Sequence, residues 1–270
     1  MIIEKTVEIV ERFFKIREIM LPKVTKVVIG LGYTGVEINF NGYEPFLGLA
    51  STLSSIVNIA DCSKIEFAGN LTNRTLTELL EWSYSPPSIK KIVGIATLNS
   101  LSQLIITLKN TYTKLKGDLL NYLSITKDTK IAVIGLIKPL IRKIQNLTNK
   151  ITLIDDTIPI SQEFSRLNFK RSIEQLEKED FLTDILICTG TVLINDTFEE
   201  ILTRFGKKTP KIIIIGPSAS MIPDILFDNG VDIVGGMEIF DSKATLQVLQ
   251  EGGGTKIFKQ YGKKYNLIKK

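Results

Sequence analysis

Apolar residues recur with two different periods in the first part of the chain. Between residues 3 and 20 they are spaced by three and four positions with charges on the opposite face, which predicts an amphipathic helix. Residues 23–30 and 35–40 are β-branched runs with a short connection, a pattern typical of a β-hairpin. Residues 65–69 suggest a third short strand, and an apolar stripe predicts a long helix over residues 88–108.

From residue 129 onward, short apolar runs alternate with helical segments. Strands are predicted at 130–135, 150–155, 184–188, 211–215 and 231–234, and helices near 138–148, 172–180, 197–205, 220–228 and 243–250. Because these strands consist almost wholly of Val, Ile and Leu, we expect both of their faces to be buried, as in a parallel sheet. Their alternation with helices predicts an α/β fold, a Rossmann-like doubly wound parallel sheet.

A polar stretch over residues 109–128 separates these two patterns. We therefore expect a small α+β domain over residues 1–108 and a Rossmann-like α/β domain over residues 109–270.

The apolar runs are far shorter than the roughly 20 residues that a membrane span requires. The first residues, MIIEKTVEIVERFFKIREIM, carry charges throughout and lack the three regions of a signal peptide. These features predict a cytoplasmic protein without a membrane partner. The net charge is +5, but no basic face interleaved with aromatic residues indicates a nucleic-acid partner. A homodimer is the expectation from general frequency alone.

Histidine is absent from the 270 residues, which excludes Ser-His-Asp and Cys-His nucleophile systems and every imidazole metal site. The two cysteines, Cys62 and Cys188, are far apart in sequence and lack the CxxC spacing of a metal site. Cys188 ends an apolar strand, so a small buried core residue is the simplest interpretation. Cys62 follows Asp61 in a polar connection, where we also favour a structural role.

Two strands of the second part end on glycine and pass into small hydroxyl residues before a helix. These loops hold Thr189, Gly190 and Thr191 after one strand, and Gly216, Pro217 and Ser218 after the next. Small residues let a ligand approach the backbone, and the carboxyl edge of a parallel sheet is where ligands of α/β proteins bind. The alternative for the second loop is that its serine only caps the following helix.

Other strand ends carry further candidates. Gly135 follows the first strand but supplies only the first glycine of G-x-G-x-x-G, so ordinary NAD or FAD binding is disfavoured. Asp155 closes the second strand, where an acid can accept ribose hydroxyls of a nucleoside-type ligand; the alternative is a solvated acidic loop. Further candidates for ligand contact or positioning are Asn195, Gly235, Gly236 and Asp118.

Three long motifs resemble one known family. The segments are ICTGTVLINDT, IIGPSASMIPDILFDNGVDIVGG and LQEGGGTKIFKQYGKKY, and the similarity continues upstream in IGLGYTGVEI, FLGLAST, GIATLNSL and KGDLLNYLSI. They are similar to the family labelled "putative heavy-metal chelation", a domain of unknown function. The resemblance covers nearly the whole chain.

This resemblance implies an enolase-amino-terminal-like domain followed by a Rossmann-like domain, with a site in the cleft between them. It would bring Gly48, Cys62 and Asn99 towards the loops at residues 189–191 and 216–218. It also suggests metal handling, by a metal ion or a metal chelate. A direct metal site would need Cys62 to approach Cys188, or one cysteine to join a carboxylate.

Three functions remain open at this point. The favoured one is a protein that binds a small molecule in the cleft, as an enzyme or as a binder; a metal-chelating or nucleoside-like compound is the expected ligand. The second is a non-catalytic carrier or sensor of a metal chelate. The third is a structural or regulatory subunit whose Rossmann-like domain is empty.

Overall fold

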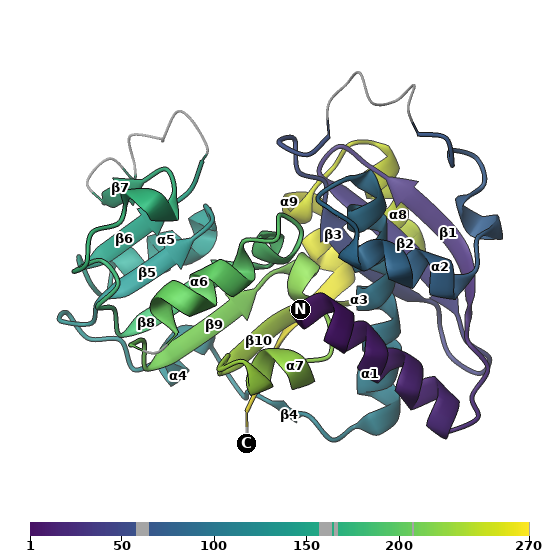
Figure 1. The fold of residues 1–270 in the computed structure, drawn as a ribbon, viewed down its shortest axis with the longest axis horizontal. Helices are drawn as coiled ribbons and strands as arrows, with labels where there is room; N and C mark the ends of the chain where they lie inside the picture. Colours follow the sequence, from purple (N-terminus) through teal and green to yellow (C-terminus); the bar gives the residue numbers. More distant parts are fainter. Residues whose placement is uncertain (58–64, 157–163, 165–166, 207, 270) are drawn as a thin grey trace.

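The computed structural model describes residues 1–57, 65–156, 164, 167–206 and 208–269. Within these residues the strands form a three-stranded antiparallel sheet, here called the small sheet, and a mostly parallel sheet of eight strands, called the large sheet. Figure 1 shows the small sheet in purple and the parallel strands of the large sheet in teal and green beside it. This mixed α/β architecture confirms the predicted fold class.

The small sheet follows the predicted hairpin. Its strands β1 (Lys23–Ile29), β2 (Tyr33–Asn39) and β3 (Phe46–Ser51) pair in this order. The helices α1 (Ile2–Ile16), α2 (Leu76–Glu81) and α3 (Ile89–Lys109) share one core with β2 and β3. The hairpin and both long helices are thus confirmed, with end points that differ by a few residues.

The third strand is β3, and the prediction of a strand at residues 65–69 is wrong because turns occupy that segment. Gly48 lies in the middle of β3. A Cβ atom at this position would lie 2.0 Å from the carbonyl oxygen of Ala96 on α3. Glycine generally weakens a strand, but here it is required because β3 lies so close to the backbone of α3.

Helix α3 forms the centre of this part of the molecule. It is long and apolar enough to cross a membrane, but 89% of its most apolar window is buried inside the fold. Every residue from Lys91 to Ile106 is buried. Its apolar composition is therefore explained by burial against protein on all sides.

The large sheet contains the predicted parallel strands. The strands are β4 (Thr113–Lys114), β5 (Ile131–Ile134), β6 (Ile151–Ile154), β7 (Asn168–Lys170), β8 (Ile185–Thr189), β9 (Lys211–Ile215), β10 (Ile233–Ile239) and β11 (Gly262–Ile268). Their order is β4-β11-β10-β9-β8-β5-β6-β7, with β4 and β11 antiparallel to their neighbours. Numbered along the chain, the six parallel strands have the order 3-2-1-4-5-6 of the Rossmann fold.

Helices cover both faces of the large sheet. On one face Ile131 and Val133 pack in a cluster with α4 (Leu119–Tyr122) and α5 (Lys138–Gln145). On the other face the intervening residues of β5 pack with α6 (Phe198–Phe205), α7 (Asp224–Asp228) and α3. Burial of both faces explains why these strands contain almost no polar residues.

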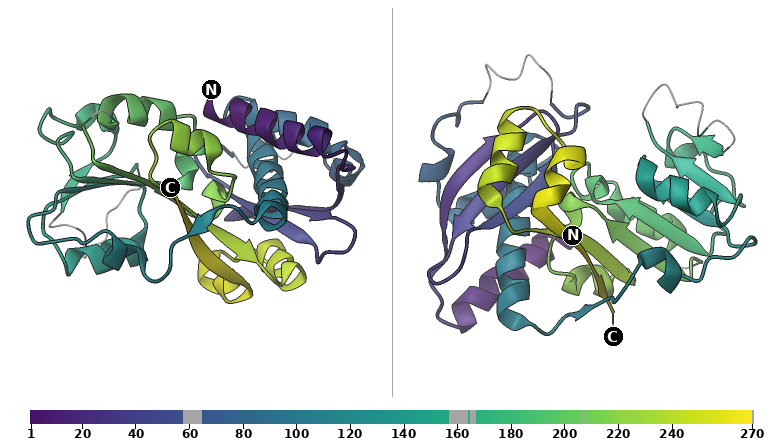
Figure 2. Two further views of the ribbon diagram at one scale, coloured as in Figure 1. Left: turned by 90° about the horizontal axis from the view of Figure 1, so that it is seen from below. Right: turned by 180° about the vertical axis from the view of Figure 1, so that it is seen from behind.

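The end of the chain returns to the small sheet. Helices α8 (Ser242–Gln250) and α9 (Thr255–Phe258) lie over the face of the small sheet opposite α3, as the right-hand view of Figure 2 shows. Leu249 and Phe258 pack there with Leu47 and Leu49 of β3. Residues from the end of the chain therefore complete the core around its beginning.

Three details of the second part differ from prediction. The helix expected at 172–180 is only a short 3₁₀ turn, Ile173–Gln175. The helix expected at 220–228 begins later, at Asp224. Strand β10 does not end at residue 234 but continues to Ile239, because the lysine-rich segment near the end of the chain, for which no strand was predicted, forms β11 and pairs with it along its length.

Candidate functional site

The strand order of the large sheet places its topological switch point between β5 and β8. From β5 the chain passes to β6 on one side, whereas β8 lies on the other side. Ligands of doubly wound sheets bind outside the carboxyl ends of the strands at such a point. Gly135 follows β5 and Thr189 ends β8, so two of the predicted residues flank this position.

Gly135 and Thr189 are in direct contact. Gly135 has a φ of 98°, a left-handed conformation that glycine adopts without strain. A Cβ atom on Gly135 would lie 2.2 Å from Cγ2 of Thr189. The Thr189 side chain therefore lies against the bare backbone of Gly135, and both residues remain partly exposed.

Asp155 also reaches this position from the end of β6. Its Oδ2 accepts a hydrogen bond from the backbone N–H of Leu136 at 2.6 Å, and the residue is partly exposed. The structure thus brings Gly135, Asp155 and Thr189 together at the ends of three adjacent strands.

The loops after β8 and β9 lie side by side at the same edge. Thr189 pairs with Ile215 in parallel register, so the two strands end at the same level. Each loop begins with a 3₁₀ turn: η6 (Gly190–Leu193) and η7 (Pro217–Ala219). A Cβ atom on Gly190 would lie 2.6 Å from the backbone nitrogen of Ala219, so glycine permits this contact. Thr191, Gly216 and Pro217 stay partly exposed.

The small sheet contacts the β9 loop through serines. The N–H of Ser51 donates to Oγ of Ser218 at 2.9 Å, and the two hydroxyl oxygens are 3.2 Å apart. Ser218 is only 2% exposed, so its hydroxyl joins the two sheets and does not face solvent.

Asn99 of α3 holds the same loop from the other side. Its Nδ2 donates to the carbonyl oxygen of Leu49 at 2.8 Å and to those of Pro217 and Ser218 at 3.2 Å. Its Oδ1 is buried without a hydrogen-bond partner among the described residues. The structure therefore brings Asn99 to the loop at 216–218, whereas Gly48 lies against the backbone of α3 at Ala96, Asn99 and Ser100.

Of the four remaining predicted residues, Gly235 of β10 lies at the same edge, where its carbonyl oxygen accepts the Gly216 N–H at 2.9 Å. Gly236 follows it, and a Cβ atom there would lie 2.3 Å from the Tyr265 hydroxyl oxygen, so this glycine allows packing within the sheet. The side-chain amide of Asn195 lies 2.7 Å from the Thr197 hydroxyl oxygen, immediately before α6, and the Asn195 backbone N–H donates to the Thr191 carbonyl oxygen at 3.1 Å.

Asp118 caps α4 by accepting the N–H of Leu120 at 2.9 Å, and it pairs with Lys143 at 3.3 Å. The Leu120 N–H, assisted by Lys143, holds the pKa of the Asp118 carboxyl below its ordinary range. Lys143 lies in the last turn of α5, which begins at the carboxyl edge of the sheet, so Asp118 is remote from the strand ends described above.

Two interactions near the group were not expected from the sequence. Gln103 of α3 donates through Nε2 to the Ser220 carbonyl oxygen at 2.8 Å and contacts the Tyr265 hydroxyl at 2.6 Å. Burial raises the pKa of the Tyr265 phenol. Lys91, at the start of α3, forms an ion pair with Asp196 in the loop after η6. The sequence signal for both interactions was the presence of polar residues within the apolar helix α3, because buried amide and ammonium groups require hydrogen-bond partners.

The described residues do not fit a heavy-metal ion held directly by side chains. No group of three or more His, Cys, Asp or Glu residues occurs in the part of the chain that the structure describes. Cys188 is fully buried, and burial raises the pKa of its thiol, which disfavours the thiolate that binds metals. Cys62 lies outside the described residues.

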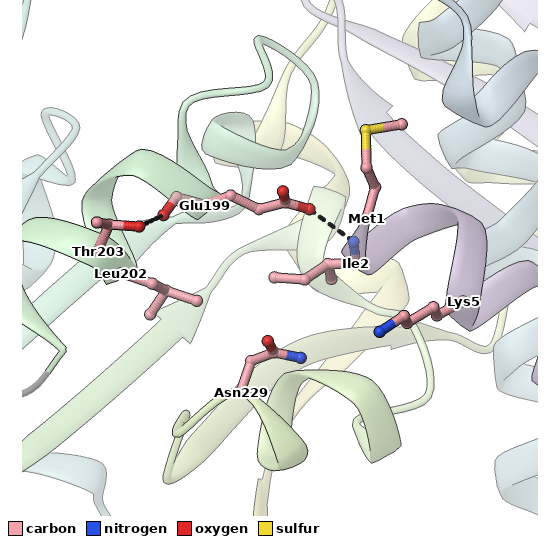
Figure 3. A pocket seen from close by; sticks show the side chains of 7 residues that line it. All are labelled: Met1, Ile2, Lys5, Glu199, Leu202, Thr203 and Asn229. Carbon is pink, nitrogen blue, oxygen red and sulfur yellow. Dashed lines mark hydrogen bonds between the residues drawn. The ribbon is translucent and has the colours of Figure 1, made fainter.

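A surface hollow lies elsewhere, between the start of α1 and α6 (Figure 3). Glu199 accepts a hydrogen bond from the Ile2 N–H at 2.7 Å on one side of it, and Lys5 and Asn229 approach from the other. None of the residues predicted from the sequence lines this hollow.

Two family models and one other protein match this chain. A family model described as "Putative heavy-metal chelation" (DUF364) matches residues 118–268, and a second model with the same description (DUF4213) matches residues 17–102. An uncharacterized protein of Methanocaldococcus jannaschii is 25% identical over 262 residues, which cover 91% of this chain and 90% of that protein.

Two crystal structures share the fold over nearly the full length. A protein of Pyrococcus horikoshii is 21% identical with a TM-score of 0.76, and 100% of each chain is covered. A protein of Desulfitobacterium hafniense is 15% identical with a TM-score of 0.71, covering 98% of this chain and 99% of that one. Both are described as proteins with unknown function from the same DUF364 family. The chain therefore belongs to the family described as putative heavy-metal chelation.

Proposed function

We propose that this protein binds a small organic molecule, a metal-chelating or nucleoside-like compound, at the carboxyl edge of the large sheet. The site lies between the two parts of the chain. It uses the loops after β5, β8 and β9, the last of which contacts the end of β3.

The observation that carries this proposal is the gathering of small, partly exposed residues at the switch point of the sheet. Gly135, Thr189, Thr191, Gly216 and Pro217 come from the ends of three strands and lie next to one another. Small residues and threonine hydroxyls offer a ligand both close approach to the backbone and hydrogen bonds. This combination at a switch point supports ligand binding more than any single loop does.

The side-chain chemistry favours a chelate over a bare ion. The chain has no histidine, and Cys188 is buried in the core with a raised thiol pKa. Hydroxyl and peptide groups instead suit the oxygen and nitrogen atoms of an organic molecule, with or without a metal that it carries.

Native mass spectrometry of untreated purified protein tests the proposal. We expect a retained organic mass, with or without a metal. A metal without an organic mass would contradict recognition of a chelate. A clean apo mass, together with no thermal shift on adding nucleosides, S-adenosylmethionine or metal chelates, would contradict the proposal as a whole.

Substitution then locates the site. Thr191→Val removes one hydroxyl at the edge, and we expect it to weaken binding of the identified molecule by roughly three- to tenfold, the contribution of one hydrogen bond. Thr203→Val makes the same change on the exposed face of α6, where the hydroxyl donates to the Glu199 carbonyl oxygen, and should leave affinity unchanged. Equal affinity of both variants and wild type would remove Thr191 from the site.

A structural or regulatory role is the second candidate, and one observation favours it. Asn99, Gln103 and Ser218 all form hydrogen bonds within the chain that fasten the β9 loop to α3 and β3. Loops built for such packing need small residues even if no ligand binds. The clean apo mass described above is the outcome that would support this candidate.

A further inference from the structure

The first turn after β5 occupies the place where doubly wound sheets contact the anionic groups of their ligands. In such folds the backbone amides of this turn, at the start of the following helix, face the phosphates of a nucleotide. In this chain the turn runs from Gly135 to Ile137 and leads into α5, a helix of eight residues.

The amides of this turn are already occupied within the chain. The N–H of Leu136 donates to Asp155 Oδ2 at 2.6 Å, and the N–H of Ile137 donates to the Gly135 carbonyl oxygen at 2.9 Å. A carboxylate oxygen and a phosphate oxygen are equivalent acceptors for an amide. Asp155 therefore supplies, from β6, the anionic oxygen that a bound phosphate would otherwise provide.

The neighbouring space is occupied as well. The Thr189 side chain lies so close to Gly135 that a Cβ atom on Gly135 would be 2.2 Å from Thr189 Cγ2. In dinucleotide-binding turns a glycine lets the pyrophosphate approach the backbone at this point. Here the glycine accommodates a threonine side chain from the adjacent strand.

We infer that Asp155, together with Thr189, is a specificity-determining residue that excludes phosphate-bearing ligands from the switch point. A phosphate brought to the Leu136 amide must displace the Asp155 carboxylate and remain next to its negative charge. Unfavourable placement of like charges is an established way to reject a wrong ligand. The site therefore selects uncharged or cationic molecules, such as a nucleoside, over nucleotides. This inference deepens the proposed function and rests on the ligand site proposed there.

The test compares Asp155→Ala with Asp156→Ala, using inorganic phosphate and ADP as probes. Asp156 is the adjacent, exposed carboxylate, so its removal makes the same change in net charge. Isothermal titration calorimetry measures affinity, and amide NMR spectra show whether the Leu136 resonance responds to phosphate. We expect Asp155→Ala to bind phosphate and ADP at least about tenfold more tightly than wild type. Asp156→Ala should resemble wild type.

Two outcomes would overturn the inference: no gain in Asp155→Ala over wild type, or a gain in Asp156→Ala that equals that of Asp155→Ala. If Asp155→Ala does not fold, Asp155→Asn replaces it and Asp156→Asn becomes the control. The amide oxygen of asparagine still accepts the Leu136 N–H without the charge. This variant must also bind phosphate more tightly than wild type and than its control. Because the probes are phosphate and ADP, the result is independent of whether an endogenous ligand is found.

Discussion

The ion pair between Lys91 and Asp196 joins the two parts of the molecule beside the β8 loop. The Lys91 side chain is only 2% exposed, whereas Asp196 is 51% exposed and has a φ of 61°. The ammonium is thus buried in the protein, and its counter-charge lies at the surface. This asymmetry predicts that removing either partner has a different effect on stability.

Replacement of Asp196 by asparagine leaves the Lys91 ammonium buried without a charged partner. For a fully buried pair, loss of one partner costs about 3–5 kcal/mol. Water can approach the ammonium from the exposed side of Asp196, so we expect a smaller loss, about 2 kcal/mol. In a chain of this size that loss corresponds to a decrease in Tm of roughly 4–8 °C.

Replacement of Lys91 by methionine removes the charge and retains most of the apolar stem. The Asp196 carboxylate is then solvated, because half of it is already exposed. We expect a loss below about 1 kcal/mol. In the double variant, Lys91→Met with Asp196→Asn, no buried charge is left without a partner, so its stability should match that of Lys91→Met.

Urea unfolding of wild type, both single variants and the double variant measures this cycle. The expected order of destabilisation is Asp196→Asn first, then Lys91→Met and the double variant at similar values. A larger loss of stability for Lys91→Met than for Asp196→Asn would refute the reasoning. It would show that side-chain packing, and not the unpaired buried charge, determines the change in stability. Additive effects of the two changes would also refute it, because a direct ion pair requires coupling.

Three further predictions concern packing, pH and thiol reactivity. Gly48→Ala should lower the free energy of unfolding by about 3 kcal/mol, because the alanine Cβ would lie 2.0 Å from the Ala96 carbonyl oxygen. Gly254 has open space around it, so Gly254→Ala should be nearly neutral in the same urea unfolding assay. Asp118 has a lowered pKa because it accepts an amide of α4, so its contribution to stability is present above its ordinary pKa of 3.8 and is lost as pH falls through the folded-state value. The stability difference between wild type and Asp118→Asn should therefore vanish in acid; a difference independent of pH would contradict this origin. Cys188 should react with a thiol reagent only after the protein unfolds, because its thiol is buried. Folded Cys188→Ala protein should therefore react with the reagent at the same rate as folded wild type. A slower reaction of the variant would show that the Cys188 thiol is accessible in the folded protein.

The sequence predicted most of the framework because burial on both faces leaves a clear local pattern. The strands β5, β8 and β9 are almost wholly Ile, Val and Leu, and α1 shows a regular helical period. Strand β11 was missed because only Tyr265 and Leu267 of its seven residues are buried and two lysines lie beside them. Its pairing with β10 depends on partners distant in sequence, which no local pattern records.

The same distinction applies to the candidate site. Glycine followed by hydroxyl residues located the edge of the sheet, and the structure places those loops side by side. The sequence did not distinguish a residue that packs from one that is exposed. Ser218 is buried against Ser51, whereas Thr191 in the neighbouring loop is partly exposed. That difference arises because the end of β3 contacts the β9 loop through Ser51.

Glycines in this chain have opposite roles that only the fold reveals. Gly252 follows α8 and has a φ of 78°. Its N–H donates to the Leu249 carbonyl oxygen, and the N–H of Gly253 donates to the Val248 carbonyl oxygen. These two bonds form a Schellman motif, which explains the glycine run as a helix end. Gly135 has a similar φ but lies at the switch point of the sheet against Thr189. A left-handed glycine is therefore an argument for a binding site only where the strand order places it at a ligand-binding edge, and in the described structure Gly135 meets that condition.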